Sequence, residues 1–117
     1  MRIPRSAALA AILFLVPAAA LAQTYVWNGP GTGSGNCTSY KMKIDVTVNG
    51  ADVKGLFLQE GRTQRHFEAK ADATGAFKTT AVVGGGGTMY VSGKTTGDGG
   101  TILLDGYCKF GGPLKKQ

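Results

Sequence analysis

The sequence is poor in the residues on which most catalytic and metal centres depend. Among 117 residues there is one histidine, His66, and it alternates with Gln64 and Glu68, so we expect it on a solvated strand face. No serine lies in a G-x-S-x-G context, and the GGGG run at 84–87 lacks the G-K-[S/T] ending of a phosphate loop. We therefore expect no enzyme activity, no cofactor and no metal.

Clusters of positive charge are also missing. The formal net charge is +6, but the Lys and Arg residues are spread along the chain, and only Lys115 and Lys116 are adjacent. Proteins that bind nucleic acids gather such residues on one face, often between aromatic side chains. The sequence therefore predicts no nucleic-acid partner.

Residues 1–22 have the three-part layout of a secretory signal peptide. Arg2 and Arg5 precede an apolar run at 7–16, and the segment ends in Ala-Leu-Ala. The run is shorter than the roughly 20 residues of a membrane-spanning helix. We expect cleavage after residue 22, a single mature domain at 23–117 with a formal charge of +4, no membrane anchor after cleavage, and a periplasmic or secreted location.

Only two cysteines are present, Cys37 and Cys108. Export would place them in an oxidising compartment, where two cysteines allow one intramolecular pairing. Two free thiols, or ligands of a metal site, are the alternatives. We predict a Cys37–Cys108 disulfide.

Glycine is abundant instead, and all 19 glycines follow residue 22. They separate short segments in which apolar and polar residues alternate, most clearly at 40–48. Asn49-Gly50 follows this segment and predicts a type I′ hairpin turn. No segment shows a helical period. Further alternating segments lie at 25–28, 53–57, 63–71, 77–83, 89–93, 102–104 and 107–110.

These segments predict an all-β domain. Connections this short join antiparallel neighbours, so the simplest topology is an up-and-down meander. We expect it to close into a small barrel of about seven or eight strands, because closure removes exposed edges. A two-sheet β-sandwich is the alternative. The predicted disulfide would then tie the first strand edge to the last.

Several motifs resemble those of known barrels. VWNGPGTGSGNC at 26–37, the alternating strand after it, VKG at 53–55 and the late glycine-flanked cysteine resemble small exported glycine-rich bacterial β-barrel proteins. More remotely, the same opening is similar to that of avidin and lipocalin-like barrels. The lipocalin G-x-W motif is absent, and Trp27 is the only tryptophan, whereas avidins line their pocket with several. The resemblance therefore implies an architecture and no particular ligand.

The two faces of the strands suggest two functions. We predict a non-enzymatic interaction or binding module of the bacterial cell envelope that contacts an envelope protein or a second copy of itself. The alternative is a carrier of a small apolar ligand inside the barrel, and an enzyme inhibitor or an enzyme ranks below both. The predicted partner surface consists of outward apolar residues: Leu56, Leu58, Val82, Tyr90 and Leu103. The predicted ligand contacts are inward aromatic residues: Trp27, Tyr40, Phe57 and Phe67.

The inner register otherwise holds mainly large apolar residues. We therefore expect the barrel to be filled by its own side chains. A pocket, if one opens, is expected beside the small inward residues Ala69, Ala71, Thr79 and Ala81.

Overall fold

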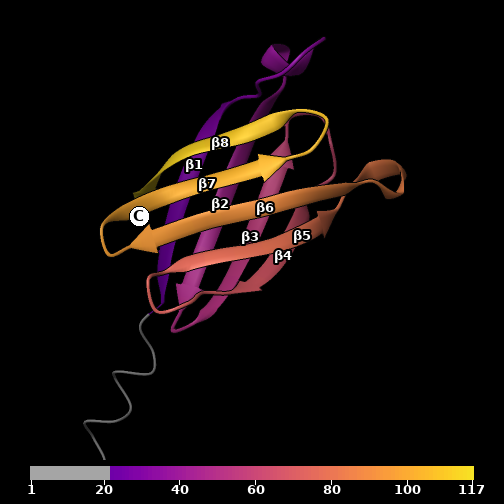
Figure 1. Ribbon diagram of the computed structural model, residues 1–117. Coiled ribbons are helices and arrows are strands. Elements are labelled where there is room, and N and C mark those ends of the chain that lie inside the picture. The colour runs from indigo at the N-terminus through magenta and orange to yellow at the C-terminus, as the bar shows by residue number, and fades with distance from the viewer. Residues whose placement is uncertain (1–21) are drawn as a thin grey trace, which may run out of the picture.

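The computed structural model describes residues 22–117, which form one eight-stranded antiparallel sheet curled into a nearly closed barrel (Figure 1). The predicted all-β meander is therefore confirmed. The predicted signal peptide lies outside the described residues, apart from Ala22. The strands are β1 (Gln23–Pro30), β2 (Lys41–Asn49), β3 (Asp52–Gln59), β4 (Arg65–Lys70), β5 (Ala76–Val82), β6 (Thr88–Thr96), β7 (Gly99–Asp105) and β8 (Lys109–Lys116).

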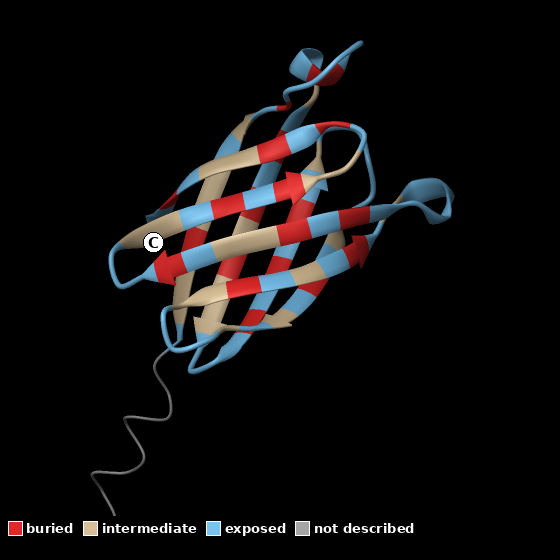
Figure 2. Ribbon diagram, viewed as in Figure 1, coloured by how far each residue is buried: buried red, intermediate tan, exposed pale blue. Residues whose placement is uncertain are grey.

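Helical structure in residues 22–117 is confined to two short 3-10 turns, η1 (Cys37–Ser39) and η2 (Gly84–Gly86). Across the same residues, no helix has the length and apolar character needed to cross a membrane. Along each strand, buried residues alternate with exposed ones (Figure 2). The predicted period of two therefore places one face of every strand inside the barrel.

The order of strands in the sheet is β4-β3-β2-β1-β8-β7-β6-β5, so β1 and β8 are paired and the free edges are β4 and β5. The first and last strands are therefore brought together as predicted, but the expectation that every short connection joins paired strands is wrong for β4 and β5. Across the seam between β4 and β5, the rings of Phe67 and Phe77 stack with centroids 6.3 Å apart. Within residues 22–117, β4 and β5 are not paired through their backbones. Side-chain packing therefore replaces main-chain pairing at the seam.

The hairpin between β2 and β3 forms as predicted, but its turn is shifted by one residue. Asn49 pairs with Asp52, so the two central residues are Gly50 and Ala51. Gly50 has a φ of 63°. In the described chain only glycines have a positive φ, so Ala51 does not have one. A type I′ turn requires two positive φ values, whereas type II′ requires one, at a first-position glycine. The shift moves each cross-strand pair by two positions and keeps every side chain on its predicted face.

Glycines on the inner face make room for aromatic rings on neighbouring strands. Gly55 of β3 pairs with Phe67 of β4, and a Cβ atom at Gly55 would lie 2.1 Å from the phenyl ring. Gly93 of β6 pairs with Phe77 of β5, and a Cβ atom there would lie 2.6 Å from the ring. Part of the high glycine content therefore serves the core and not the turns.

The junction between β1 and β8 is filled in the same way. The two strands are paired at two positions, Tyr25 with Lys116 and Val26 with Lys115, and a bridge joins Thr32, just after β1, to Lys109 of β8. Between these points Trp27 packs against the core, and a Cβ atom at Gly29 or Gly112 would lie 2.6 or 2.8 Å from its indole ring. The single tryptophan therefore occupies the β1–β8 junction and contributes to barrel closure.

The two ends of the barrel are built differently. We call the end with the tight turns at 50–51, 71–75 and 97–98 the closed end, where the Tyr25 hydroxyl donates to the Gly97 carbonyl oxygen at 2.8 Å. The opposite end, which we call the mouth, carries the connections at 31–40, 60–64, 83–87 and 106–108. The connections at the mouth are therefore all longer than the two-residue turns at 50–51 and 97–98, and binding residues are most often found in loops.

Candidate functional site

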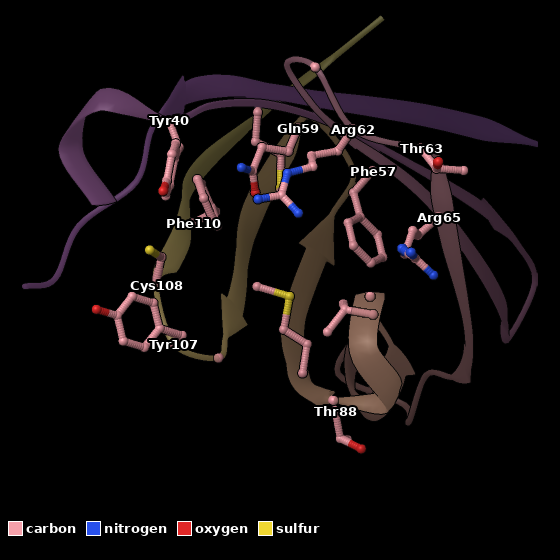
Figure 3. A pocket seen from close by; sticks show the side chains of 17 residues that line it. Tyr40, Phe57, Gln59, Arg62, Thr63, Arg65, Thr88, Tyr107, Cys108 and Phe110 are labelled. Atoms are coloured by element: carbon pink, nitrogen blue, oxygen red, sulfur yellow. The ribbon is translucent and has the colours of Figure 1, made fainter. Parts of the chain in front are cut away.

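A pocket of about 710 Å³ opens at the mouth (Figure 3). This volume lies within the usual range for small-molecule sites, roughly 300–1,000 Å³. Four buried apolar side chains from four different strands line the pocket: Met42, Phe57, Met89 and Phe110. We call these four residues the floor. The floor closes the pocket toward the barrel interior with apolar surface.

Arg65 stands at the edge of this pocket. It is the first residue of β4, pairs with Phe57, and shares the inner face with Phe67 because the two are separated by two positions. The Arg65 side chain is half-buried. A Cβ atom built on Gly84 would lie 3.5 Å from its guanidinium nitrogen Nη2, so Arg65 reaches across the seam to the loop after β5.

Arg62 adds a second positive charge, from the loop between β3 and β4. It is exposed, and Figure 3 shows its side chain extending over the pocket. Polar groups of Gln59, Thr63 and Tyr40 line the same rim. The mouth therefore combines an apolar floor with a polar, positively charged rim.

No carboxylate balances these two arginines. The pocket lining contains no Asp or Glu. Within residues 22–117, which hold all seven acidic side chains, Arg62 and Arg65 form no salt bridge, and the two ion pairs found there involve lysines. A half-buried guanidinium without a counter-charge keeps its hydrogen-bonding capacity available to an anion.

The disulfide fixes one wall of the mouth. Cys37 and Cys108 are bonded, with Cα atoms 5.4 Å apart, which confirms the predicted pairing. Cys37 is fully buried, and Cys108 lines the pocket beside Tyr107. The bond therefore ties the β1–β2 connection to the β7–β8 connection, and links the first strand to the last at the mouth as predicted.

The predicted ligand contacts separate into two pairs. Tyr40 and Phe57 line the mouth pocket. Trp27 and Phe67 do not line it, since Trp27 fills the junction of β1 and β8 and Phe67 faces the β4–β5 seam. A ligand-binding role for all four stays a prediction.

Sequence reasoning missed Arg65 and misplaced the pocket. Arg65 lies two residues before Phe67 in an inward register, and extending the alternation by one step would have put a cation inside the mouth. The four small inward residues were expected to border a pocket, but none of them lines the mouth. Only Ala81 borders a separate groove along the β4–β5 seam.

The five outward apolar residues are all exposed, from 38% for Leu103 to 68% for Tyr90. Leu56 pairs with His66, and His66 and Val82 line the same groove along the seam. His66 of β4 therefore lies between the apolar residues of β3 and Val82 of β5. Their use as a partner surface stays a prediction.

Two carboxylates have lowered pKa values, and both lie at the closed end. A hydrogen bond from Lys70 and its positive charge lower the pKa of Asp52. Three hydrogen bonds lower the pKa of Asp72, whose Oδ1 accepts from the Thr74 hydroxyl at 2.7 Å and from the backbone N–H groups of Thr74 and Ala76 at 2.8 and 3.2 Å. These groups stabilise a strand pair and a turn and lie far from the pocket.

The fold and the pocket together define a small eight-stranded β-barrel with an open, positively charged mouth. Comparison with protein families, curated proteins and solved structures found no match. In residues 22–117, no three His, Cys, Asp or Glu side chains gather in a way that could hold a metal ion. The likeness to avidin and lipocalin barrels is therefore supported at the level of a small β-barrel only.

Proposed function

We propose that this chain is an exported, non-enzymatic binding protein of the periplasm or the extracellular space that holds a small molecule in the barrel mouth. One observation carries the proposal, the pocket of about 710 Å³ whose floor is apolar and whose rim is polar. Sites of this composition are the usual places where proteins bind small ligands.

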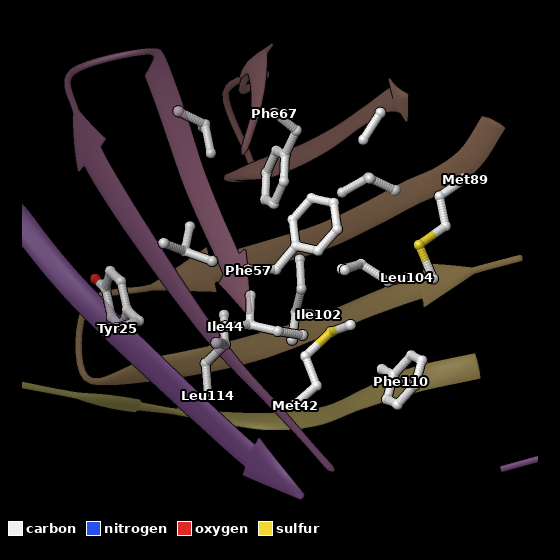
Figure 4. Close-up of a cluster of buried hydrophobic side chains, with 14 of the residues drawn as sticks. Tyr25, Met42, Ile44, Phe57, Phe67, Met89, Ile102, Leu104, Phe110 and Leu114 are labelled. Carbon is white, nitrogen blue, oxygen red and sulfur yellow. The ribbon is translucent and has the colours of Figure 1, made fainter. Parts of the chain in front are cut away.

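The filled interior supports the mouth as the ligand site. Buried side chains from all eight strands meet inside the barrel (Figure 4). Ile44, the next inward residue after Met42 on β2, has no exposed surface, and Val91, the next after Met89 on β6, is 2% exposed. A ligand deep in the barrel would have to displace this core, whereas a ligand at the mouth would not.

A substitution of Val83 tests the proposal, with its neighbour Val82 as a matched control. Val83 lines the pocket and is half-buried, whereas Val82 points outward and is exposed. We expect the uncharged dye Nile red to fluoresce on binding the purified protein, Val83→Trp to weaken this binding at least about tenfold, and Val82→Trp to leave it unchanged. Equal binding by all three proteins would contradict the proposal.

An interaction surface on the outside of the barrel is the second candidate. Its support is the exposure of Val82 and Tyr90 on adjacent strands, continued by Leu103 on the next strand. Contiguous exposed apolar residues are typical of protein interfaces. An envelope protein or a second copy of this chain is the partner that this candidate implies.

A further inference from the structure

We propose that the mouth pocket selects organic anions with a compact apolar body, and that Arg65 binds the anionic group. This inference rests on the proposed function and adds the class of ligand. It follows from three features of the mouth: an unbalanced, half-buried charge, a shallow apolar floor and the shape of the guanidinium group.

The charge of Arg65 has no acidic partner among the described residues. Partial burial of a guanidinium removes part of its hydration, and this costs free energy unless a partner replaces the lost water. Among the described residues no carboxylate pairs with Arg65, and the pocket wall offers no acidic group at all. An anionic ligand would supply the missing partner, whereas a cationic ligand would meet two positive charges.

The floor limits the apolar part of the ligand. Met42, Phe57, Met89 and Phe110 are each at most 7% exposed, and the next inward residues below the first three, Ile44, Gly55 and Val91, are buried as well. A long chain therefore has no channel to enter. Methionine and aromatic side chains instead offer adaptable and flat contact surfaces, which suit a compact body such as a fused ring.

The shape of the Arg65 guanidinium group determines which anionic group the ligand carries. Arginine presents its N–H donors in a planar fork that matches a carboxylate or phosphate group with two parallel hydrogen bonds. Arg65 is fixed at a strand end, where its backbone is paired with Phe57, while Arg62 stands on an exposed loop. Arg65 is thus the primary contact of the anionic group, and Arg62 attracts the anion toward the mouth.

Calorimetric titration with three probes of the same body tests the inference. The probes are 2-naphthoate, 2-naphthylmethanol and 2-naphthylmethylammonium, which are anionic, neutral and cationic. We expect naphthoate to bind at least about tenfold more tightly than the alcohol, because charged hydrogen bonds are worth more than neutral ones. The ammonium compound should bind more weakly than the alcohol.

Two variants distinguish the effect of the Arg65 charge in the pocket from the effect of the protein's net charge. Arg65→Met should reduce naphthoate affinity to that of the alcohol while alcohol binding stays within about threefold, which also shows that the variant is folded. Lys54→Met removes the same charge from an exposed position on β3 outside the pocket and should change nothing. A titration with 2-naphthyl phosphate shows whether carboxylate or phosphate is the preferred group.

The outcomes distinguish the selection of anions by Arg65 from ligand binding at the mouth. If the alcohol binds as tightly as naphthoate, or if Arg65→Met binds naphthoate like the unchanged protein, the selection of anions by Arg65 is overturned and binding at the mouth stands. If none of the probes binds, both proposals fail.

Discussion

The closed end and the mouth of the barrel differ in how their loops and their charges are arranged. At the closed end the turns are tight, and Asp52 and Asp72 have hydrogen-bond partners within a few residues of the turns. At the mouth the connections are longer, and Arg62 and Arg65 have no acidic partner among residues 22–117. The difference fits the proposed function, in which the closed end stabilises the fold and the charges of the mouth bind a ligand.

Loss of the disulfide should have the largest effect. The bond spans 71 residues, and the loop-entropy relation gives a stabilisation of about 4 kcal/mol. We expect the double variant Cys37→Ser, Cys108→Ser to lose about that much free energy of unfolding, measured in urea by the fluorescence of Trp27. The reduced protein should show a similar loss. A loss below about 1 kcal/mol would mean that the mouth is held together without the bond.

Filling the space above an inner glycine should have the next largest effect. A Cβ atom at Gly55 would overlap the Phe67 ring, so we expect Gly55→Ala to lower the free energy of unfolding by about 1–3 kcal/mol. Gly87 at the mouth is the control, since its nearest neighbour would be a Val83 methyl group at 3.4 Å. Gly87→Ala should stay within about 0.5 kcal/mol of the unchanged protein. Equal losses would show that the Phe67 ring does not limit the space at Gly55.

Acid should affect the stability of the closed end less than the Gly55 substitution does, and it should act through Asp72. The hydrogen bonds from Thr74 and Ala76 lower the pKa of Asp72 in the folded protein below its usual value. Their stabilising effect is therefore complete at neutral pH and is lost as the pH falls through the folded pKa. Thr74→Val removes the strongest donor, so the Asp72 pKa should rise toward its usual value, as measured by carboxyl NMR. An unchanged pKa would contradict the assignment.

Charging the outer face should have the smallest effect on stability. Val82 and Leu103 are exposed, so we expect Val82→Lys with Leu103→Lys to change the free energy of unfolding by no more than about 0.5 kcal/mol. If this face binds a partner or a second copy, sedimentation should show that the association is lost. A large fall in stability would instead show that these side chains contribute to the core.

The sequence predicts the strands and the barrel better than the position of the seam. Alternation places Phe57 and Phe67 inside and Leu56 and His66 outside, because the period of two depends only on neighbouring residues. The position of the seam depends instead on packing between residues far apart, such as Phe67 against Phe77. Local patterns carry no information about that contact.

The candidate site is predictable only in part, for a similar reason. The disulfide follows from the count of cysteines, and it identifies one wall of the mouth. The pocket itself depends on how four connections meet at one end, which no single segment encodes. The turn at Gly50 and Ala51 also shows that a strong Asn-Gly signal can predict a hairpin correctly and misplace its central residues.

A two-dimensional NMR titration of the isotope-labelled protein with 2-naphthoate tests the contrast between the two ends most directly. We expect amide shifts at the mouth, in residues 60–65, 83–87 and 106–108, and none in the closed-end turns at 50–51, 72–75 and 97–98. Shifts confined to the closed end or to the outer faces of β5, β6 and β7 would contradict a ligand site at the mouth.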